Sequence, residues 1–189
     1  MTELSVEQMN YGPLNALIGT WKGDDGMDVA PEPDGEEHSP FYEVITIEPA
    51  GDVDNAEEQE LMILRYHQAV FRKSNDKQFH DQVGYWLWCE ASQTIMQTLT
   101  IPRGVSLLAG GTATVEADTT TLQVEAKDGD PDWGIVQSPF MRKKARTLGF
   151  RHRVNVSGDT LRYEETTLLD IYDKHNFEHT DGNTLTRQR

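Results

Sequence analysis

Short alternations of apolar and polar residues fill most of the chain, and this pattern predicts β-strands. Residues 78–89 show it most clearly, because Phe79, Val83, Tyr85 and Leu87 recur on one face at a period of two. Similar segments lie at 41–47, 60–71, 94–101, 105–108, 111–116, 121–126, 145–156 and 160–168. Turn-forming residues separate them, and Gly158 lies in a tight loop typical of a hairpin.

About ten short strands with short connections predict an all-β fold. A meander of this size hides its edges best by closing on itself. We therefore expect a closed or nearly closed antiparallel up-and-down barrel, with residues 1–189 forming a single domain. A β-sandwich is the competing architecture, but the longer crossovers that it needs are not seen in this chain.

The N-terminal region predicts how one end of the barrel is closed. Pro13 suits the first turn of a short helix, and Gly19 lets the chain leave that helix. Trp21 then opens the first strand, where a large indole can plug one end of a small barrel. The alternative is an ordinary core tryptophan after a loop.

Two strongly acidic segments, near 24–38 and 50–59, contain several proline, glycine and aspartate residues and predict loops. Their charges are most simply a solvated surface. A calcium-binding site is the functional alternative, but the spacing of the carboxylates does not match an EF-hand loop. Residues 128–142 predict a long connection or a short helix. Residues 170–189 show little strand pattern and could lie across a barrel mouth.

The charge balance excludes several classes of partner. The chain has 17 Lys and Arg residues against 32 Asp and Glu residues, a formal net charge of −15. Nucleic acids and anionic membrane surfaces are therefore not expected as partners. No apolar run is long enough to cross a bilayer, and no signal sequence is evident at the N-terminus. The single cysteine, Cys89, fits a reducing compartment, so we expect a cytoplasmic protein, with a homodimer possible.

The second face of residues 78–89 carries the main candidate binding residues. It combines His80 and Gln82 with Trp86 and Trp88, a mixture of hydrogen-bonding and aromatic groups that suits a pocket. The pattern alone leaves open which face turns inward. If this face does, we expect a small apolar or amphipathic ligand that also contacts Tyr66.

An inward arginine could hold the ligand's polar head, with Arg153 as the first candidate and Arg151 and Arg162 as the others. Alternatively, such an arginine could stack on Trp21 and close the barrel floor.

Other catalytic chemistry finds little support in the motifs. Cys89 lies in an apolar strand and is better explained as a small buried side chain than as a nucleophile. His175 and His179 lie four residues apart and could hold zinc with a third ligand, but no zinc signature accompanies them.

Several motifs together resemble the nitrobindin-like, or haem-binding β-barrel, family, whose fold is akin to those of fatty-acid-binding proteins and lipocalins. They are residues 17–23 (LIGTWKG), 79–86 (FHDQVGYW), 103–107 (RGVSL) with 110–111 (GG), and 158–163 (GDTLRY). Their order and spacing agree over roughly residues 14 to 185.

The resemblance implies haem b as a possible cofactor. His179 would be the axial ligand of the iron, and His80, Trp86 and Trp88 would line its other side. It also implies nitric oxide binding or isomerisation of peroxynitrite to nitrate. Carboxylates occupy residues 23–28 and 178–181, where the family pattern differs, so a haem-free barrel that carries an apolar or amphipathic ligand is the other hypothesis.

Overall fold

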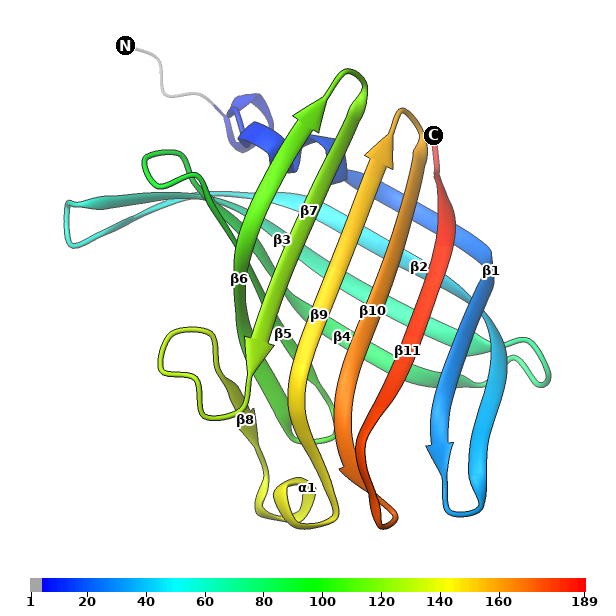
Figure 1. Cartoon of the computed structure of the whole chain (residues 1–189). Coiled ribbons are helices and arrows are strands. Elements are labelled where there is room, and N and C mark those ends of the chain that lie inside the picture. Colours follow the sequence, from blue (N-terminus) through cyan, green and yellow to red (C-terminus); the bar gives the residue numbers. More distant parts are fainter. Residues whose placement is uncertain (1–4) are drawn as a thin grey trace.

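Ten antiparallel strands close into a barrel, and an eleventh short strand extends one edge of its wall (Figure 1). The computed structural model describes residues 5–189. The strands are β1 (Gly19–Glu32), β2 (Gly35–Asn55), β3 (Gln59–Arg72), β4 (Gln78–Cys89), β5 (Thr94–Ile101), β6 (Val105–Glu116), β7 (Thr119–Lys127), β8 (Ile135–Gln137), β9 (Ala145–Ser157), β10 (Thr160–Ile171) and β11 (Lys174–Arg187). The short helices are η1 (Val6–Gln8), η2 (Gly12–Leu17) and α1 (Pro139–Lys144).

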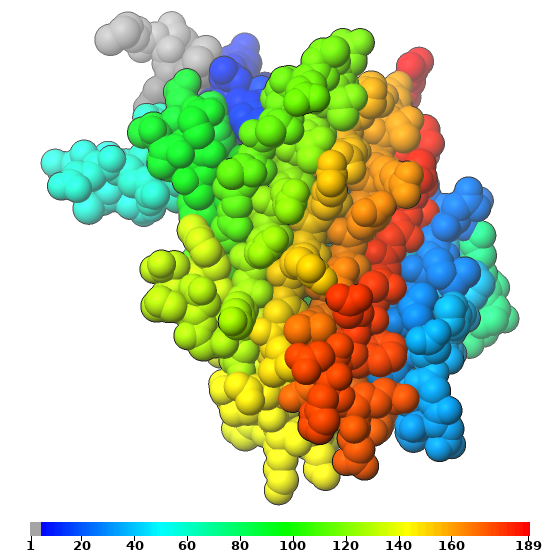
Figure 2. Space-filling model, in the orientation of Figure 1, coloured from blue at the N-terminus to red at the C-terminus, as the bar shows by residue number. Residues whose placement is uncertain are grey.

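The ring closes where the last strand pairs with the first. β11 runs antiparallel to β1, with Trp21 opposite Arg187 and Asp28 opposite Asp181. β5 and β6 complete the circle on the other side, while β8 pairs only with the start of β6. Figure 2 shows the closure from outside, with β11 in red beside β1 in blue. A single sheet that closes on itself confirms the predicted barrel and excludes a sandwich.

The two acidic segments predicted as loops are largely strand, so that prediction was wrong. β1 and β2 form one long hairpin whose turn is only residues 33–34, and β2 continues to Asn55 before a turn at 56–58. From Ser39 to Ile47 every second side chain is buried, as a half-buried strand requires. Glu43 is one of these buried side chains, and the high acidic content of the flanking residues concealed this alternation.

The C-terminal segment was also assigned incorrectly. β10 continues to Ile171 and β11 fills residues 174–187, so the chain end is part of the wall and does not lie across the mouth. Its polar residues alternate between lumen and solvent, with Asn183 and Leu185 buried. Polar residues on the inner face hid the strand pattern in the sequence.

β4 turns its mixed face into the barrel. Gln82, Trp86 and Trp88 are buried, whereas Val83 and Tyr85 on the other face are 47% and 46% exposed. The orientation that the sequence pattern left open is thereby settled. In residues 5–189, no helix combines the length and apolar character that a membrane span requires.

The end of the barrel beside η2 is closed by packed side chains. Leu14, Leu17 and Trp21 are fully buried there, and Nε1 of Trp21 donates a 2.7 Å hydrogen bond to the carbonyl oxygen of Leu17. The guanidinium of Arg187 lies over the Trp21 ring at 4.1 Å and donates to the carbonyl oxygens of residues 16 and 18. Gly19 has a φ of 138°, a conformation that favours glycine, and a Cβ there would lie 3.2 Å from Arg187 Nη1.

The opposite end, which we call the mouth, is bounded by the turns β1–β2, β3–β4, β5–β6 and β10–β11, with α1 beside it (Figure 1).

Removal of the Arg187 side chain tests the closed end. We expect Arg187→Ala to lower the free energy of unfolding by about 2 kcal/mol, because it loses the stacking on Trp21 and leaves buried carbonyl oxygens without a donor. Urea denaturation measures this change. The matched control is Arg189→Ala, since the Arg189 side chain is 90% exposed, and it should change stability by less than about 0.5 kcal/mol. Equal effects of the two substitutions would contradict the role given to Arg187.

Candidate functional site

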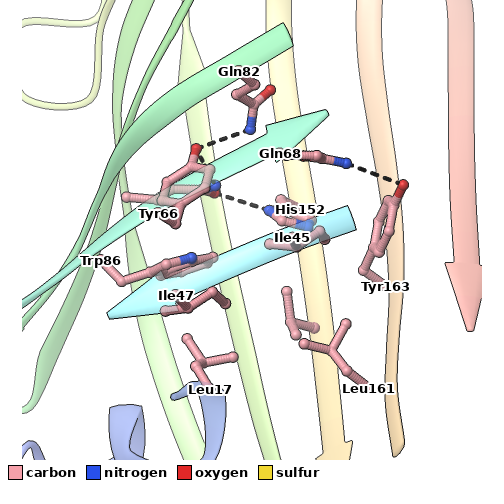
Figure 3. Close-up of a pocket in the computed structure, with 12 residues that line it drawn as sticks. Leu17, Ile45, Ile47, Tyr66, Gln68, Gln82, Trp86, His152, Leu161 and Tyr163 are labelled. Atoms are coloured by element: carbon pink, nitrogen blue, oxygen red, sulfur yellow. Dashed lines mark hydrogen bonds between the residues drawn. The ribbon is translucent and has the colours of Figure 1, made fainter. Parts of the chain in front are cut away.

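The barrel interior has an apolar layer near η2 and a polar layer above it (Figure 3). Apolar residues that line the cavity include Leu17, Ile45, Ile47, Trp86, Val154 and Leu161, and the polar ones are Tyr66, Gln68, Gln82, Gln97, His152 and Tyr163. The space left for the centre of a water-sized sphere is about 20 Å³. That is enough for about one ordered water. Side chains therefore fill most of this part of the lumen.

One hydrogen-bonded chain crosses the polar layer through Tyr66. Gln82 and Gln97 donate to its hydroxyl oxygen at 2.9 and 3.1 Å, and the hydroxyl donates to the carbonyl oxygen of Thr98. Nδ1 of His152 lies 2.9 Å from Oε1 of Gln97 and donates to it, because an amide oxygen can only accept. Burial lowers the pKa of His152 to about 3, so its imidazole is neutral at physiological pH.

A second cluster surrounds the buried carboxylate of Glu43. It accepts hydrogen bonds from Gln68 at 2.7 Å, Asn183 at 2.8 Å and the Tyr163 hydroxyl at 3.0 Å. Burial raises the pKa of Glu43, and the three donors offset part of that effect. Figure 3 shows the hydrogen bond between Gln68 and Tyr163 that joins β3 to β10. The buried carboxylate of Glu43 is thus paired within the protein.

Two histidines face the lumen nearer the mouth. Nε2 of His179 lies 2.7 Å from Oδ1 of Asp28, and Nε2 of His80 lies 3.2 Å from Oε1 of Gln82. Burial lowers the pKa of His80. Burial also disfavours a charged His179, but the hydrogen bond and charge of Asp28 overcome this and raise the pKa of His179. The two environments therefore shift the pKa of an imidazole in opposite directions.

Acidic side chains surround the same region. Asp181 and Glu165 are partly buried on the inner face of the barrel, next to Asp28. Burial and the charge of Glu43 raise the pKa of Glu165 to about 8. Burial and the charge of Glu165 raise the pKa of Asp181. Ligand atoms of Asp28, His179 and Asp181 all lie within 4.8 Å of one another, a separation that a metal ion could bridge.

The structure brings most of the predicted site residues together, with two exceptions. His80, Gln82, Trp86 and Tyr66 face the lumen, and His179 reaches it from β11. Trp88 is buried instead at the closed end, where its ring packs against the backbone of Gly12. The Arg153 side chain is exposed on the outer face of β9, so it does not hold a ligand head.

The structure also decides between the alternatives considered for an arginine on Trp21, for His175 and for Cys89. Arg187, and none of the three arginines considered from the sequence, stacks on Trp21. His175 is 78% exposed beside Asp170 and does not approach His179 as a zinc pair. Cys89 is buried with a free thiol, as expected.

Several residues of the site were missed from the sequence: Asp28, Glu43, Glu165, Asp181 and His152. Asp28 and Asp181 lie in segments that had been assigned to loops or to no regular structure. The others sit on inner strand positions where an apolar residue is usual. The period of two could have found two of them. Glu165 lies two residues after the buried Tyr163, and Asp181 lies two residues before the buried Asn183, so both share the inner face of their strands.

Haem was the cofactor implied by the resemblance, and the mouth meets only one of its requirements. Imidazole nitrogens suit haem iron. However, Nε2 of His179 is already held by Asp28, and the carboxyl groups of Asp28, Asp181 and Glu165 lie side by side near it on the inner face, where they would oppose the negative charge of a porphyrin. As they stand, these residues do not fit haem.

Comparison with known proteins agrees with the barrel. The solved structure titled "Crystal Structure of Rv2717c from M. tuberculosis" superposes with a TM-score of 0.67, at 20% sequence identity, over 94% of this chain and 98% of that one. At this identity the likeness shows the fold alone. No curated protein gives a significant match to the chain.

The family comparison extends over nearly the whole barrel. The model described as "THAP4-like, heme-binding beta-barrel domain" matches residues 10–187, from the residues before η2 to the end of β11. A match of this extent, together with the closed barrel, shows the family directly. The chain belongs to the THAP4-like, haem-binding β-barrel domain family.

Proposed function

We propose that this protein binds a small amphipathic molecule that enters through the mouth of the barrel. The observation that carries the proposal is the orientation of β4, which turns Gln82 and Trp86 into the lumen together. A few converging polar groups in an apolar enclosure are typical of a ligand site. The apolar part of the ligand would reach Ile45 and Leu161, and its head would meet Tyr66 and Gln82.

The charge of the lumen limits the chemistry of the head group. No lysine or arginine is among the residues that line the cavity in residues 5–189, and His152 is neutral. Arg103, exposed at the β5–β6 turn, is near enough to influence both mouth histidines. Asp28, Asp181 and Glu165 lie in the same region and can be only neutral or negative. A neutral or cationic head is therefore favoured over a carboxylate or a phosphate.

The size of the free space limits the ligand further. Because only about one water fits between the side chains, the apolar part of a ligand must displace some of them. Trp86, which lies next to Tyr66, and Leu161, deeper in the apolar layer, are the side chains that such a ligand would move (Figure 3).

Haem b is the second candidate, because membership of a haem-binding family supports it. It requires Asp28 to release Nε2 of His179 and the surrounding carboxyl groups to stay protonated. When bound, haem would supply an iron for small ligands such as nitric oxide. The peroxynitrite chemistry implied by the resemblance depends on this candidate alone.

Two finer expectations from the sequence stay proposals. The single cysteine, buried and unpaired, supports a reducing compartment such as the cytoplasm. A homodimer would be detected by light scattering of the purified protein.

Fluorescent probes test the amphipathic ligand and its head group. We expect neutral 1-aminoanthracene to bind more tightly than the anionic 8-anilinonaphthalene-1-sulfonate. Gln82→Leu should weaken the binding of 1-aminoanthracene about tenfold, since it loses one hydrogen bond. The matched control is Val83→Thr, the outward neighbour on β4, which should leave the affinity unchanged. Equal affinity for the two probes, or no effect of Gln82→Leu, would show that the probe does not bind beside Gln82 in the lumen.

The neutral state of His152 predicts how stability depends on pH. Its folded pKa of about 3 lies below its ordinary value of 6.5. Only the unfolded chain therefore takes up this proton between those pH values, and stability is lost as the pH falls. Between pH 7 and pH 5 we expect the wild type to lose up to about 2 kcal/mol more than His152→Gln, measured by urea denaturation. Identical pH slopes for the two proteins would show that His152 is not held neutral.

A haemin titration followed by visible absorption tests the second candidate. We expect Asp28→Asn to bind haemin more tightly than the wild type, because it removes a negative charge and leaves Nε2 of His179 less strongly held. His179→Ala should abolish the Soret shift in either background. If neither the wild type nor Asp28→Asn shifts the Soret band of the added haemin, haem is not the ligand.

A further inference from the structure

A row of three carboxyl groups crosses adjacent strands on the inner face of the barrel. Asp28 on β1 lies directly opposite Asp181 on β11, and Asp181 lies directly opposite Glu165 on β10. Directly opposite residues on one face of an antiparallel sheet have Cβ atoms about 5 Å apart. The row therefore concentrates up to three negative charges in the mouth.

Like charges in this arrangement destabilise a sheet unless something neutralises them. No hydrogen bond from any group in residues 5–189 reaches the side chains of Asp181 or Glu165, so donors of the protein do not serve this purpose. His179, which contacts Asp28, can offset one charge of the row, and a bound cation would offset the rest.

His179 adds a nitrogen donor to the row. It lies two residues before Asp181 on the same face of β11, and its Nε2 contacts Asp28 across the seam between β11 and β1. One atom each from Asp28, His179 and Asp181 falls within a cluster 4.8 Å across. Metal ligands at about 2.0–2.2 Å from an ion lie closer together than this, so small side-chain rotations would complete the site.

We propose that Asp28, His179 and Asp181 bind one divalent transition-metal ion in the mouth of the barrel. An imidazole with two carboxylates favours Zn²⁺ or Mn²⁺ over Mg²⁺ and Ca²⁺, which prefer oxygen ligands alone. Three protein ligands leave a coordination position open toward the mouth. The proposal goes beyond the amphipathic ligand, since the metal does not require it.

The metal and haem are mutually exclusive at this site. Nε2 of His179 can ligate only one ion, and Asp28 and Asp181 would bind the small cation while opposing a porphyrin. Carboxylates replace the family pattern at residues 178–181 of this chain. In the proposed site they would favour a metal ion bound directly by the protein over haem.

Isothermal titration of the chelator-treated, full-length protein with Zn²⁺ tests the proposal. We expect one site in the wild type, with the release of about one proton per ion, detected as a dependence of the heat on the buffer. Asp181→Asn and His179→Gln should each weaken the site at least about tenfold, the effect that even outer-sphere partners of a metal produce. The matched control is Glu178→Gln, an exposed neighbour paired with Arg151, which should leave it unchanged.

Two measurements keep the result interpretable. Circular dichroism identifies a variant that fails to fold, and the absorption spectrum of added Co²⁺ reports ligation in those that do fold. Retention of wild-type affinity in both Asp181→Asn and His179→Gln would place the ion on the acidic outer surface and overturn the proposal. Absence of Zn²⁺ binding by the wild type would also overturn it, and would leave protons as what neutralises the row. Probe binding by the chelated protein reports separately on the amphipathic ligand.

Discussion

The pairing of β1 with β11 is the constraint on which the remaining structure depends. It joins segments at the two ends of the sequence, and it sets which residues of those strands meet. The closed end depends on it, because Arg187 reaches Trp21 only from this register. The mouth depends on it equally, because the same ladder places His179 beside Asp28. A shift by one residue would turn both sets of side chains to the opposite face.

Polar side chains inside the barrel explain its internal organisation. Burial of amide, phenol and carboxyl groups is tolerated where each finds a partner. Tyr66 and Glu43 each gather several partners, and the hydrogen bonds between His152 and Gln97 and between Gln68 and Tyr163 join strands on different sides of the barrel. The networks therefore connect the wall across the lumen, in addition to the ladders that connect neighbouring strands. Such networks favour a single arrangement of the interior.

The sequence predicted the architecture but only part of the site. Alternation was clear where the inner face is apolar or aromatic, so most of the strands, including β4 with His80 and Gln82, were found. It failed where both faces are polar. Asp28 and Asp181 were missed for this reason, since an inward carboxylate looks the same as a solvated one in a local pattern. Whether a carboxylate is buried depends on strand partners that are distant in sequence, and no local pattern records them.

Because the two ends of the chain meet only in the finished barrel, the mouth is among the last parts of the molecule to be assembled. Asp28 and His179 are separated by 151 positions, and contacts of such separation form late because the loop between them must first be ordered. A nascent chain whose β11 segment has not yet emerged from the ribosome would have a partial sheet with two open edges and no complete site. A ligand or metal ion bound in the mouth would then distinguish full-length molecules from truncated ones.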